Sequence, residues 1–284
     1  MLRDALTALG LSLALVSASP ALARTQSDVV PTPVVIGQSY ALPSTVYGET
    51  REINVWLPPG YADSGKSYPV LYLLDGGQDQ DFHHISGLVQ LGTIVGTTKD
   101  IILIGVASKD RRNELAFRAT HDASLVADYP THGQSERFRR FLAEEVKHFV
   151  EARYRTDGDD GVIGESLAGL FIVETFLKQP DLFDRYMAIS PSLWWDDSTM
   201  VSEAAALMAA QKPAPRTLWL TIANEGAEMQ AATDTLVDAI RDPLPEGLTA
   251  SYERREGETH ATTYHPAALD ILRDVYAPPA DTAP

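Results

Sequence analysis

The stretch Gly161-Val-Ile-Gly-Glu-Ser-Leu-Ala-Gly-Leu-Phe-Ile-Val173 decides the fold of this chain. It begins as an apolar strand, breaks at Gly164 and restarts at Leu167 as an apolar helix. Small residues, Gly164 and Ala168, stand two positions before and two after the serine at the corner. A sharp strand-to-helix turn brings these two positions close together, so both must be small. Such a turn lifts the serine hydroxyl out of the sheet and points the next backbone N–H, that of Leu167, toward an oxyanion. The stretch therefore predicts a nucleophile elbow centred on Ser166.

Segments typical of strands alternate along the chain with segments typical of helices. Short, continuous apolar runs indicate strands buried on both faces, and apolar residues at helical spacing indicate covering helices. This alternation predicts an α/β fold, a mostly parallel central sheet with helices on both faces, in which ligands bind at the carboxyl ends of the strands. We expect strands at residues 35–44, 51–57, 68–74, 101–106, 161–164, 185–190, 217–222 and 250–253, the first two antiparallel, and helices at 135–154, 167–178, 200–210, 229–240 and 266–276.

The two ends of the chain differ in composition from its middle. Arg3 precedes an apolar run at residues 5–16, and Ala21-Leu22-Ala23 offers the small residues that a signal peptidase needs. We therefore expect residues 1–23 to be an export signal cleaved after Ala23, with an uncleaved membrane anchor as the alternative. Residues 24–33 and 277–284 are expected to be flexible tails, and 34–276 a single hydrolase-sized domain. The expected location is the periplasm or the outside of the cell, without stable membrane association.

Charge and cysteine content narrow the classes of partner. The formal net charge of -16 argues against nucleic acid and anionic lipid, and it disfavours a strongly anionic substrate. The chain has no cysteine, so disulfides and a lipid-modified cysteine after the signal are excluded. An exported chain without disulfides must depend on a large apolar core.

A serine hydroxyl is a poor nucleophile near neutral pH and needs a neighbouring base. His260 follows the last expected strand, where a loop returns to the carboxyl edge of the sheet, and we expect it to be that base; a surface histidine is the alternative. His265 precedes Pro266 and is interpreted as the start of the final helix. The base needs a carboxylate to fix its tautomer. Glu225, just after the strand at 217–222, is placed best, with Glu228, Asp196 and Asp197 as alternatives.

Three further motifs are candidates for the site. Gly77 or Gln78, after the turn at Gly76, is expected to supply the second oxyanion donor, and a simple turn is the alternative. Trp194 and Trp195 are interpreted either as walls of a substrate pocket or as packing of a covering helix. His83-His84, with Asp79 and Asp81 nearby, has no recognisable metal-ligand spacing, so we expect no metal.

Several segments together resemble the putative esterase branch of the α/β-hydrolase superfamily, which includes the ferric-enterobactin esterases and the esterase D-like enzymes. The resemblance covers residues 35–276. It rests on Tyr68-Pro-Val-Leu-Tyr-Leu-Leu-Asp-Gly, Phe141-Leu-Ala-Glu-Glu-Val, Tyr154-Arg-Thr, Gly164-Glu-Ser-Leu-Ala-Gly-Leu, Ala188-Ile-Ser-Pro-Ser-Leu-Trp-Trp-Asp and Gly257-Glu-Thr-His.

The resemblance implies a serine hydrolase that uses Ser166 and His260, with an acid near Glu225 or with a serine–histidine dyad, and without metal or organic cofactor. Two departures stand out. The elbow carries Ala168 where many members have glycine. The asparagine-arginine signature of the family is present only as Lys109-Asp-Arg-Arg-Asn, which leaves Arg111, Arg112 and Asn113 without an assigned role.

The expected function is that of an exported carboxylic-ester hydrolase acting on a small-molecule ester through an acyl-enzyme on Ser166, with His260 as general base. One alternative is a siderophore esterase that cleaves a catecholate trilactone. Another is a catalytically silent binding protein with a hydrolase fold. The oligomeric state is left open.

Overall fold

The computed structural model describes residues 30–279. The chain divides into two units, Met1–Val35 and Ile36–Pro284, and the second contains every strand and helix reported below. The expected export signal and its cleavage site after Ala23 lie outside the described residues, as do residues 24–29 and 280–284 of the expected tails. Within residues 30–279, no helix combines the length and the apolar character needed to cross a membrane.

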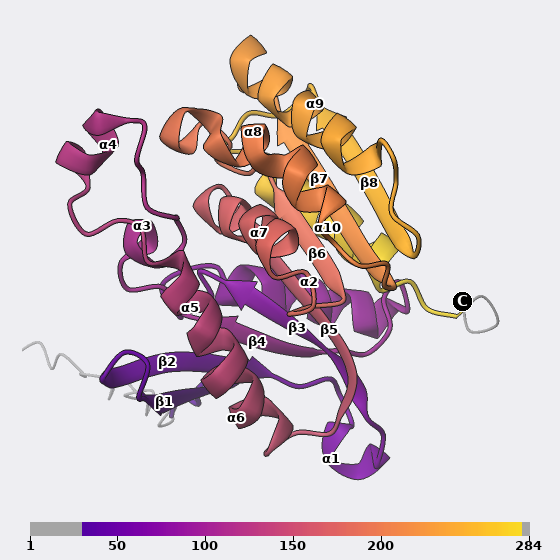
Figure 1. The fold of residues 1–284 in the computed structure, drawn as a ribbon. Helices are drawn as coiled ribbons and strands as arrows, with labels where there is room; N and C mark the ends of the chain where they lie inside the picture. The colour runs from indigo at the N-terminus through magenta and orange to yellow at the C-terminus, as the bar shows by residue number, and fades with distance from the viewer. Residues whose placement is uncertain (1–29, 280–284) are drawn as a thin grey trace, which may run out of the picture. The chain divides into compact units, whose positions relative to one another are not determined.

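The second unit is built on an eight-stranded sheet in the order β1-β2-β4-β3-β5-β6-β7-β8 (Figure 1). The first two neighbouring pairs, β1 with β2 and β2 with β4, are antiparallel, and all the others are parallel. The expected mostly parallel sheet is thus confirmed. The strands are β1 (Gln38–Ser44), β2 (Glu49–Trp56), β3 (Tyr68–Leu74), β4 (Ile102–Val106), β5 (Thr156–Glu165), β6 (Arg185–Ile189), β7 (Arg216–Ala223) and β8 (Leu248–Arg255).

Helices cover both faces of this sheet. One face carries α2 (Phe82–Val95) and α10 (Tyr264–Val275). The other carries α5 (Ser135–Phe141), η1 (Leu142–Val146), α6 (Lys147–Glu151), α7 (Leu167–Lys178), α8 (Trp195–Ala209) and α9 (Ala227–Arg241). The helix expected at 135–154 is therefore one run of α5, η1 and α6 in which the middle segment is wound as a π-helix. The short helices are α1 (Tyr61–Ser64), α3 (Arg111–Glu114) and α4 (Ala123–Asp128).

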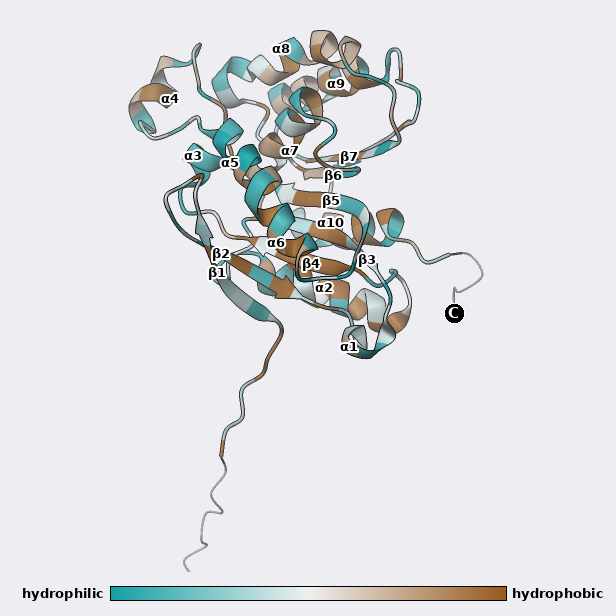
Figure 2. Cartoon of the chain, turned by 60° about the horizontal axis from the view of Figure 1, so that its bottom comes forward, coloured by the Kyte–Doolittle hydropathy of each residue, from teal (hydrophilic) through white to brown (hydrophobic). Residues whose placement is uncertain are grey.

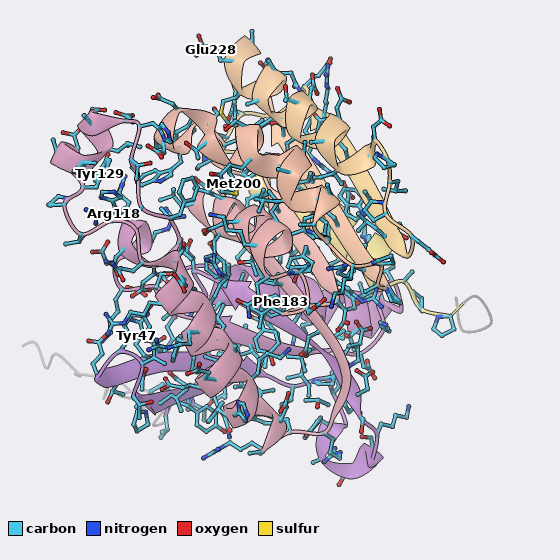
Figure 3. All side chains as sticks on the ribbon, viewed as in Figure 1. Tyr47, Arg118, Tyr129, Phe183, Met200 and Glu228 are labelled. Atoms are coloured by element: carbon cyan, nitrogen blue, oxygen red, sulfur yellow. The ribbon has the colours of Figure 1, made fainter. Side chains whose placement is uncertain are left out.

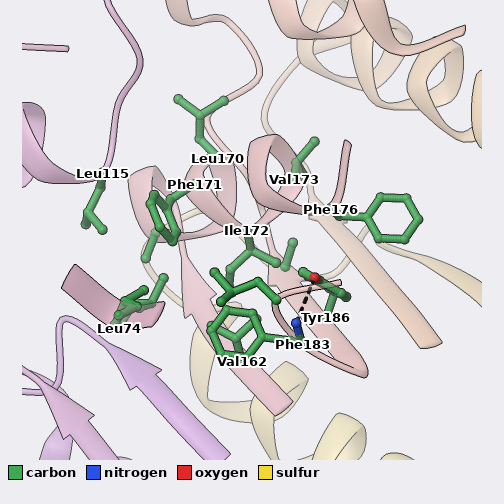
Figure 4. Packing of buried hydrophobic residues seen from close by; sticks show 14 of the residues in the cluster. Leu74, Leu115, Val162, Leu170, Phe171, Ile172, Val173, Phe176, Phe183 and Tyr186 are labelled. Carbon is green, nitrogen blue, oxygen red and sulfur yellow. Dashed lines mark hydrogen bonds between the residues drawn. The ribbon is translucent and has the colours of Figure 1, made fainter. Parts of the chain in front are cut away.

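The core lies in two layers, one on each face of the sheet. Along β3, Leu71 and Leu73 pack with α2 and α10, whereas Tyr72 and Leu74 pack with the layer of α5 and α7. Successive side chains of a strand point to opposite faces, so a strand covered on both sides is apolar throughout, as β3 is. Figure 2 shows this apolar character along β3 and β4. Figure 4 shows the α7 layer, where the Phe183 N–H donates to the Tyr186 hydroxyl at 3.0 Å.

A long connection, residues 107–134, joins β4 to α5 and contains α3 and α4 (Figure 1). A buried ion pair fixes its start, since the Arg51 guanidinium contacts both carboxylate oxygens of Glu114 at 2.7 and 2.8 Å. Asp196, fully buried, fixes its middle by accepting the backbone N–H groups of residues 120, 121 and 122 at 2.7–2.9 Å. Arg118 and Tyr129 project from this connection (Figure 3). The connection is therefore held at two points, against β2 through Arg51 and against α8 through Asp196.

Candidate active site

Ser166 occupies the corner between β5 and α7 with φ 62° and ψ -119°, a backbone conformation that non-glycine residues rarely adopt. The turn is closely packed. A Cβ atom on Gly164 would lie 2.5 Å from the Cβ atom of Ala168, so only one of these two positions can carry a side chain. The half-buried serine therefore stands at the carboxyl edge of the sheet in the geometry expected of an elbow.

The backbone N–H of Leu167 is the first of α7, where a helix offers no internal acceptor. The other two expected oxyanion donors are engaged. The Gly77 N–H donates to Gln80 Oε1 at 2.9 Å, and the Gln78 N–H donates to Glu52 Oε1 at 3.0 Å. The assignment of the second donor to Gly77 or Gln78 stays a prediction, and it requires one of these bonds to open.

His260 and Glu225 lie side by side on the loops after β8 and β7. His260 Nδ1 is 3.0 Å from Glu225 Oε2, and the Asn224 N–H ties the two loops together by donating to the Glu258 carbonyl at 2.9 Å. The His260 side chain is 44% exposed, whereas that of Glu225 is 13% exposed. Because the carboxylate engages Nδ1, Nε2 is the nitrogen left to exchange a proton with a substrate or nucleophile.

The alternative acids lie elsewhere. Glu228 is exposed in the first turn of α9 (Figure 3). Asp196 is committed to the 107–134 connection, and Asp197 is exposed. Of the four candidate acids, only Glu225 contacts His260.

The histidine–carboxylate contact changes the proton affinity of both groups. The hydrogen bond with Glu225 is the largest influence on His260 and raises the pKa of its imidazole, against burial, which acts to lower it. For Glu225, burial acts to raise the pKa, but hydrogen bonds from His260 and Ser190 outweigh it and the pKa is lowered. Glu225 therefore stays ionised while His260 gains or loses a proton, as a general base requires.

Among the described residues, no hydrogen bond joins the Ser166 hydroxyl to His260. Its hydrogen-bond partner is the hydroxyl of Ser192, 3.2 Å away. A bond between nucleophile and base is often long or absent before substrate binds and tightens in the reactive complex. A movement of either side chain is required before a proton can pass between Ser166 and His260.

Glu225, Glu165 and Arg111 act electrostatically on His260, and two further carboxyl groups, Asp75 and Asp81, lie near Arg111 or Glu165. Asp75 follows β3 and binds Arg111 of α3, whose Nε and Nη2 each lie 2.8 Å from its Oδ2. Burial raises the pKa of Asp81 to about 6 and that of Glu165 to about 7. Glu165 raises the pKa of His260, and Arg111 lowers it. The surroundings of the base are thus predominantly acidic.

The two neighbouring tryptophans lie in different environments, and His84 of the His83-His84 pair contacts His265. Trp195 is fully buried, and its Nε1 donates to the Phe117 carbonyl at 2.9 Å, so it packs the core and cannot line a pocket. Trp194 is 47% exposed and stays the predicted pocket residue. His84 Nε2 lies 2.9 Å from His265 Nδ1, in a stacked pair that joins α2 to α10. His265 thus lies in the first turn of the final helix, where the sequence places it.

Three polar residues beside the site received no role from sequence. Ser192 was part of a quoted motif, but its contact with Ser166 depends on the pairing of β5 with β6. Glu165 precedes the serine and ends β5, and Arg111 reaches the site from a distant connection. Their positions in the sequence could have indicated a place near the site, because Glu165 ends a strand of the sheet and Ser192 and Arg111 lie in loops or connections that follow one.

Comparisons with known proteins give the family and the fold of the chain. A siderophore enterobactin esterase of Emericella nidulans is 30% identical over 187 residues, 57% of this chain and 60% of that protein, so the match spans less than two thirds of that relative. The ferri-bacillibactin esterase BesA of Bacillus subtilis is 26% identical over 235 residues, 75% of this chain and 80% of that protein. An IroE-like serine hydrolase from Shewanella oneidensis has a similar structure, with a TM-score of 0.78 at 27% identity over 84% of this chain and 80% of that chain.

The family model described as “Putative esterase” matches residues 44–265, which include the elbow, Glu225 and His260. The α/β-hydrolase fold and the enzyme class, a carboxylic-ester hydrolase, are thereby confirmed. The chain belongs to the putative esterase family.

Proposed function

We propose that Ser166, His260 and Glu225 form the catalytic triad of this esterase. In acylation, the Ser166 Oγ attacks the ester carbonyl while its proton passes to His260, and the carbonyl electrons move to the oxygen, where the Leu167 N–H stabilises them. The tetrahedral intermediate then collapses. The bond to the alcohol oxygen breaks, and protonated His260 gives its proton to the departing alcohol.

Deacylation repeats the sequence with water. His260 removes a proton from the water as its oxygen attacks the acyl carbonyl, and the Ser166 oxygen leaves with the proton that His260 returns. Glu225 remains ionised throughout and stabilises the imidazolium through the 3.0 Å contact with Nδ1. The observation that carries the proposal is this contact, on adjacent loops at the strand end beside the elbow.

The proposed substrate is a small-molecule ester, and two classes are weighed. The names of the Emericella and Bacillus relatives favour siderophore esters, including catecholate lactones. The acidic surroundings of His260 favour a neutral ester over a highly anionic one. We give priority to neutral esters and keep siderophore lactones as the second candidate.

Export to the periplasm or the medium is part of the proposal and rests on the sequence of residues 1–23. Expression of the full chain followed by N-terminal sequencing of the protein outside the cytoplasm tests it. A mature N-terminus at Arg24 is expected. Retention of Met1 on a membrane-bound protein would favour an uncleaved anchor.

The catalytic assignment is tested with purified Ser166→Ala and His260→Ala variants and p-nitrophenyl acetate. Both variants are expected to keep their circular dichroism spectrum and to lose at least about 10³-fold in kcat. Ser202→Ala, which removes an exposed hydroxyl of α8, is the matched control. Full activity in folded Ser166→Ala would overturn the assignment.

A panel of neutral aryl esters, their anionic analogues and siderophore lactones then separates the two substrate classes. Labelling by a fluorophosphonate tests the remaining alternative, a silent binding protein. Such a protein would stay unlabelled, whereas an esterase is expected to be labelled on Ser166.

A further inference from the structure

Ser192 lies against the nucleophile from a different strand. It follows β6, which pairs in parallel with β5, and its N–H donates to the Ser166 carbonyl at 3.0 Å. Its hydroxyl oxygen is 3.2 Å from the Ser166 Oγ. Ser192 is 3% exposed, so this polar group is buried at the foot of the elbow.

The buried Ser192 hydroxyl needs an acceptor for its proton, and this need fixes which of the two serines donates the hydrogen bond. A serine hydroxyl has one proton to donate and can accept two. Within residues 30–279, Ser166 is the only hydrogen-bond partner of the Ser192 hydroxyl. If Ser166 donated, the buried proton of Ser192 would have no acceptor, which is costly. Ser192 therefore donates, and the proton of half-buried Ser166 is left free for its base.

The segment that carries Ser192 is held rigidly. A Cβ atom on Gly169 of α7 would lie 3.0 Å from both the Pro191 Cα and the Ile189 carbonyl oxygen, so the backbone after β6 packs directly on the helix behind the nucleophile. Two residues before Ser192, the Ser190 hydroxyl accepts the Ala223 N–H of β7 at 3.0 Å. Because the residues before Ser192 are fixed and its own N–H is bonded to the Ser166 carbonyl, the backbone of Ser192 is held beside the nucleophile.

We propose that Ser192 is a further catalytic residue, which holds the Ser166 oxygen in place by a donated hydrogen bond and stabilises the negative charge that develops on it during attack. This inference rests on the proposed role of Ser166 as nucleophile. No atom or proton is added to the reaction, since the Ser192 proton stays on its own oxygen throughout. The bond strengthens as the charge on the acceptor grows, because hydrogen bonds to charged groups are stronger than neutral ones.

The test compares Ser192→Ala with Ser192→Thr, which keeps the donor, and with Ser86→Ala. Ser86 is also fully buried, but its hydroxyl donates to the His83 carbonyl in α2. For Ser192→Ala we expect kcat on p-nitrophenyl acetate to fall about 10- to 100-fold, with KM changed less than about twofold. Inactivation by a fluorophosphonate, which reacts with the same oxygen, should slow by the same factor. Ser192→Thr should recover most of both rates, and Ser86→Ala should match the parent.

The outcomes are distinct. Parental kcat and labelling rate in folded Ser192→Ala would overturn the inference, as would equal losses in Ser192→Ala and Ser192→Thr. If the alanine variant does not fold, Ser192→Cys takes its place, because cysteine is close to serine in size but is a weak hydrogen-bond donor. A parental kcat in Ser192→Cys would also overturn the inference. Failure of the proposed function is recognised separately, because Ser166→Ala would then remain active.

Discussion

Replacing Gly164 by alanine is the most direct perturbation of the elbow. The added Cβ atom would meet the Cβ atom of Ala168 at 2.5 Å, whereas carbon atoms in good contact lie about 3.5–4.0 Å apart. The strand end and the start of α7 must therefore separate by about 1 Å. Overpacking of this kind typically costs about 1–3 kcal/mol of unfolding free energy. Since Ser166 lies between the two positions, its hydroxyl moves with them.

The structure also predicts the remedy. With Ala168→Gly, the nearest atoms to the new methyl group are the backbone C and Cα of residue 168, at 3.4 and 3.5 Å, which are ordinary contacts. Alone, Ala168→Gly costs about 1 kcal/mol as a helix substitution. The double variant Gly164→Ala/Ala168→Gly should lose about the same amount, instead of the sum of the two. The expected coupling free energy is therefore about 1–3 kcal/mol in favour of the double variant.

Urea denaturation of the four proteins measures this coupling, and kcat for p-nitrophenyl acetate measures the position of the nucleophile. A displacement of about 1 Å can lower the rate about 100-fold, so Gly164→Ala should be slow and the double variant largely restored. Strictly additive unfolding free energies would show that the two Cβ atoms do not compete. Unaltered kcat in a destabilised Gly164→Ala would show that the elbow does not place the reactive oxygen.

Three further predictions concern charge. Glu225→Gln removes the hydrogen-bonded charge that raises the pKa of His260, so the acid limb of the pH profile of kcat/KM should move to lower pH. The value of kcat should fall by up to about 10⁴-fold. An acid limb at the parental pH would contradict the assignment of Glu225. Glu165→Gln should move the acid limb in the same direction by a smaller amount, because the Glu165 charge also raises the pKa of His260. The pH profile of kcat/KM on a neutral ester measures this shift. A shift of the limb to higher pH would contradict the prediction. Arg51→Met strands the buried carboxylate of Glu114 and should cost about 3–5 kcal/mol in urea denaturation, much of which Arg51→Met/Glu114→Gln should recover.

The secondary structure could be predicted from the sequence where a segment is buried along nearly its whole length. The expected bounds of β3 and α7 agree with the structure because every residue of β3 is buried and almost all of α7 is. α2 was not predicted. Its Leu91, Ile94 and Val95 are exposed apolar residues, so the contrast between a buried and a solvent face is weak in its sequence. Two internal glycines weaken the helical signal further.

The candidate site was partly predictable for a topological reason. In a parallel sheet the carboxyl ends of neighbouring strands meet at one edge, so residues after β5, β7 and β8 can be expected together without knowing any distance. This placed Ser166, Glu225 and His260. The contact of Ser192 with the nucleophile could not be expected in this way, because it depends on where a hydroxyl points. The burial of Trp195, which removes it from any pocket, was equally invisible in the motif that contains it.

The acidic groups near His260 bear on which ester the site accepts. The Asp75 carboxylate contacts Arg111, whereas the side chains of Asp81 and Glu165 have no such partner in the hydrogen bonds and ion pairs of residues 30–279. With pKa values of about 6 and about 7, Asp81 and Glu165 become ionised as pH rises, and His260, whose pKa is raised above its usual value, loses its proton in the same direction. As pH rises, the base becomes available while its surroundings become more negative. The deprotonation of His260 favours the hydrolysis of both esters, but the growing negative charge repels only an anionic siderophore ester. With rising pH, the ratio of kcat/KM for the neutral ester to kcat/KM for the anionic ester should therefore increase.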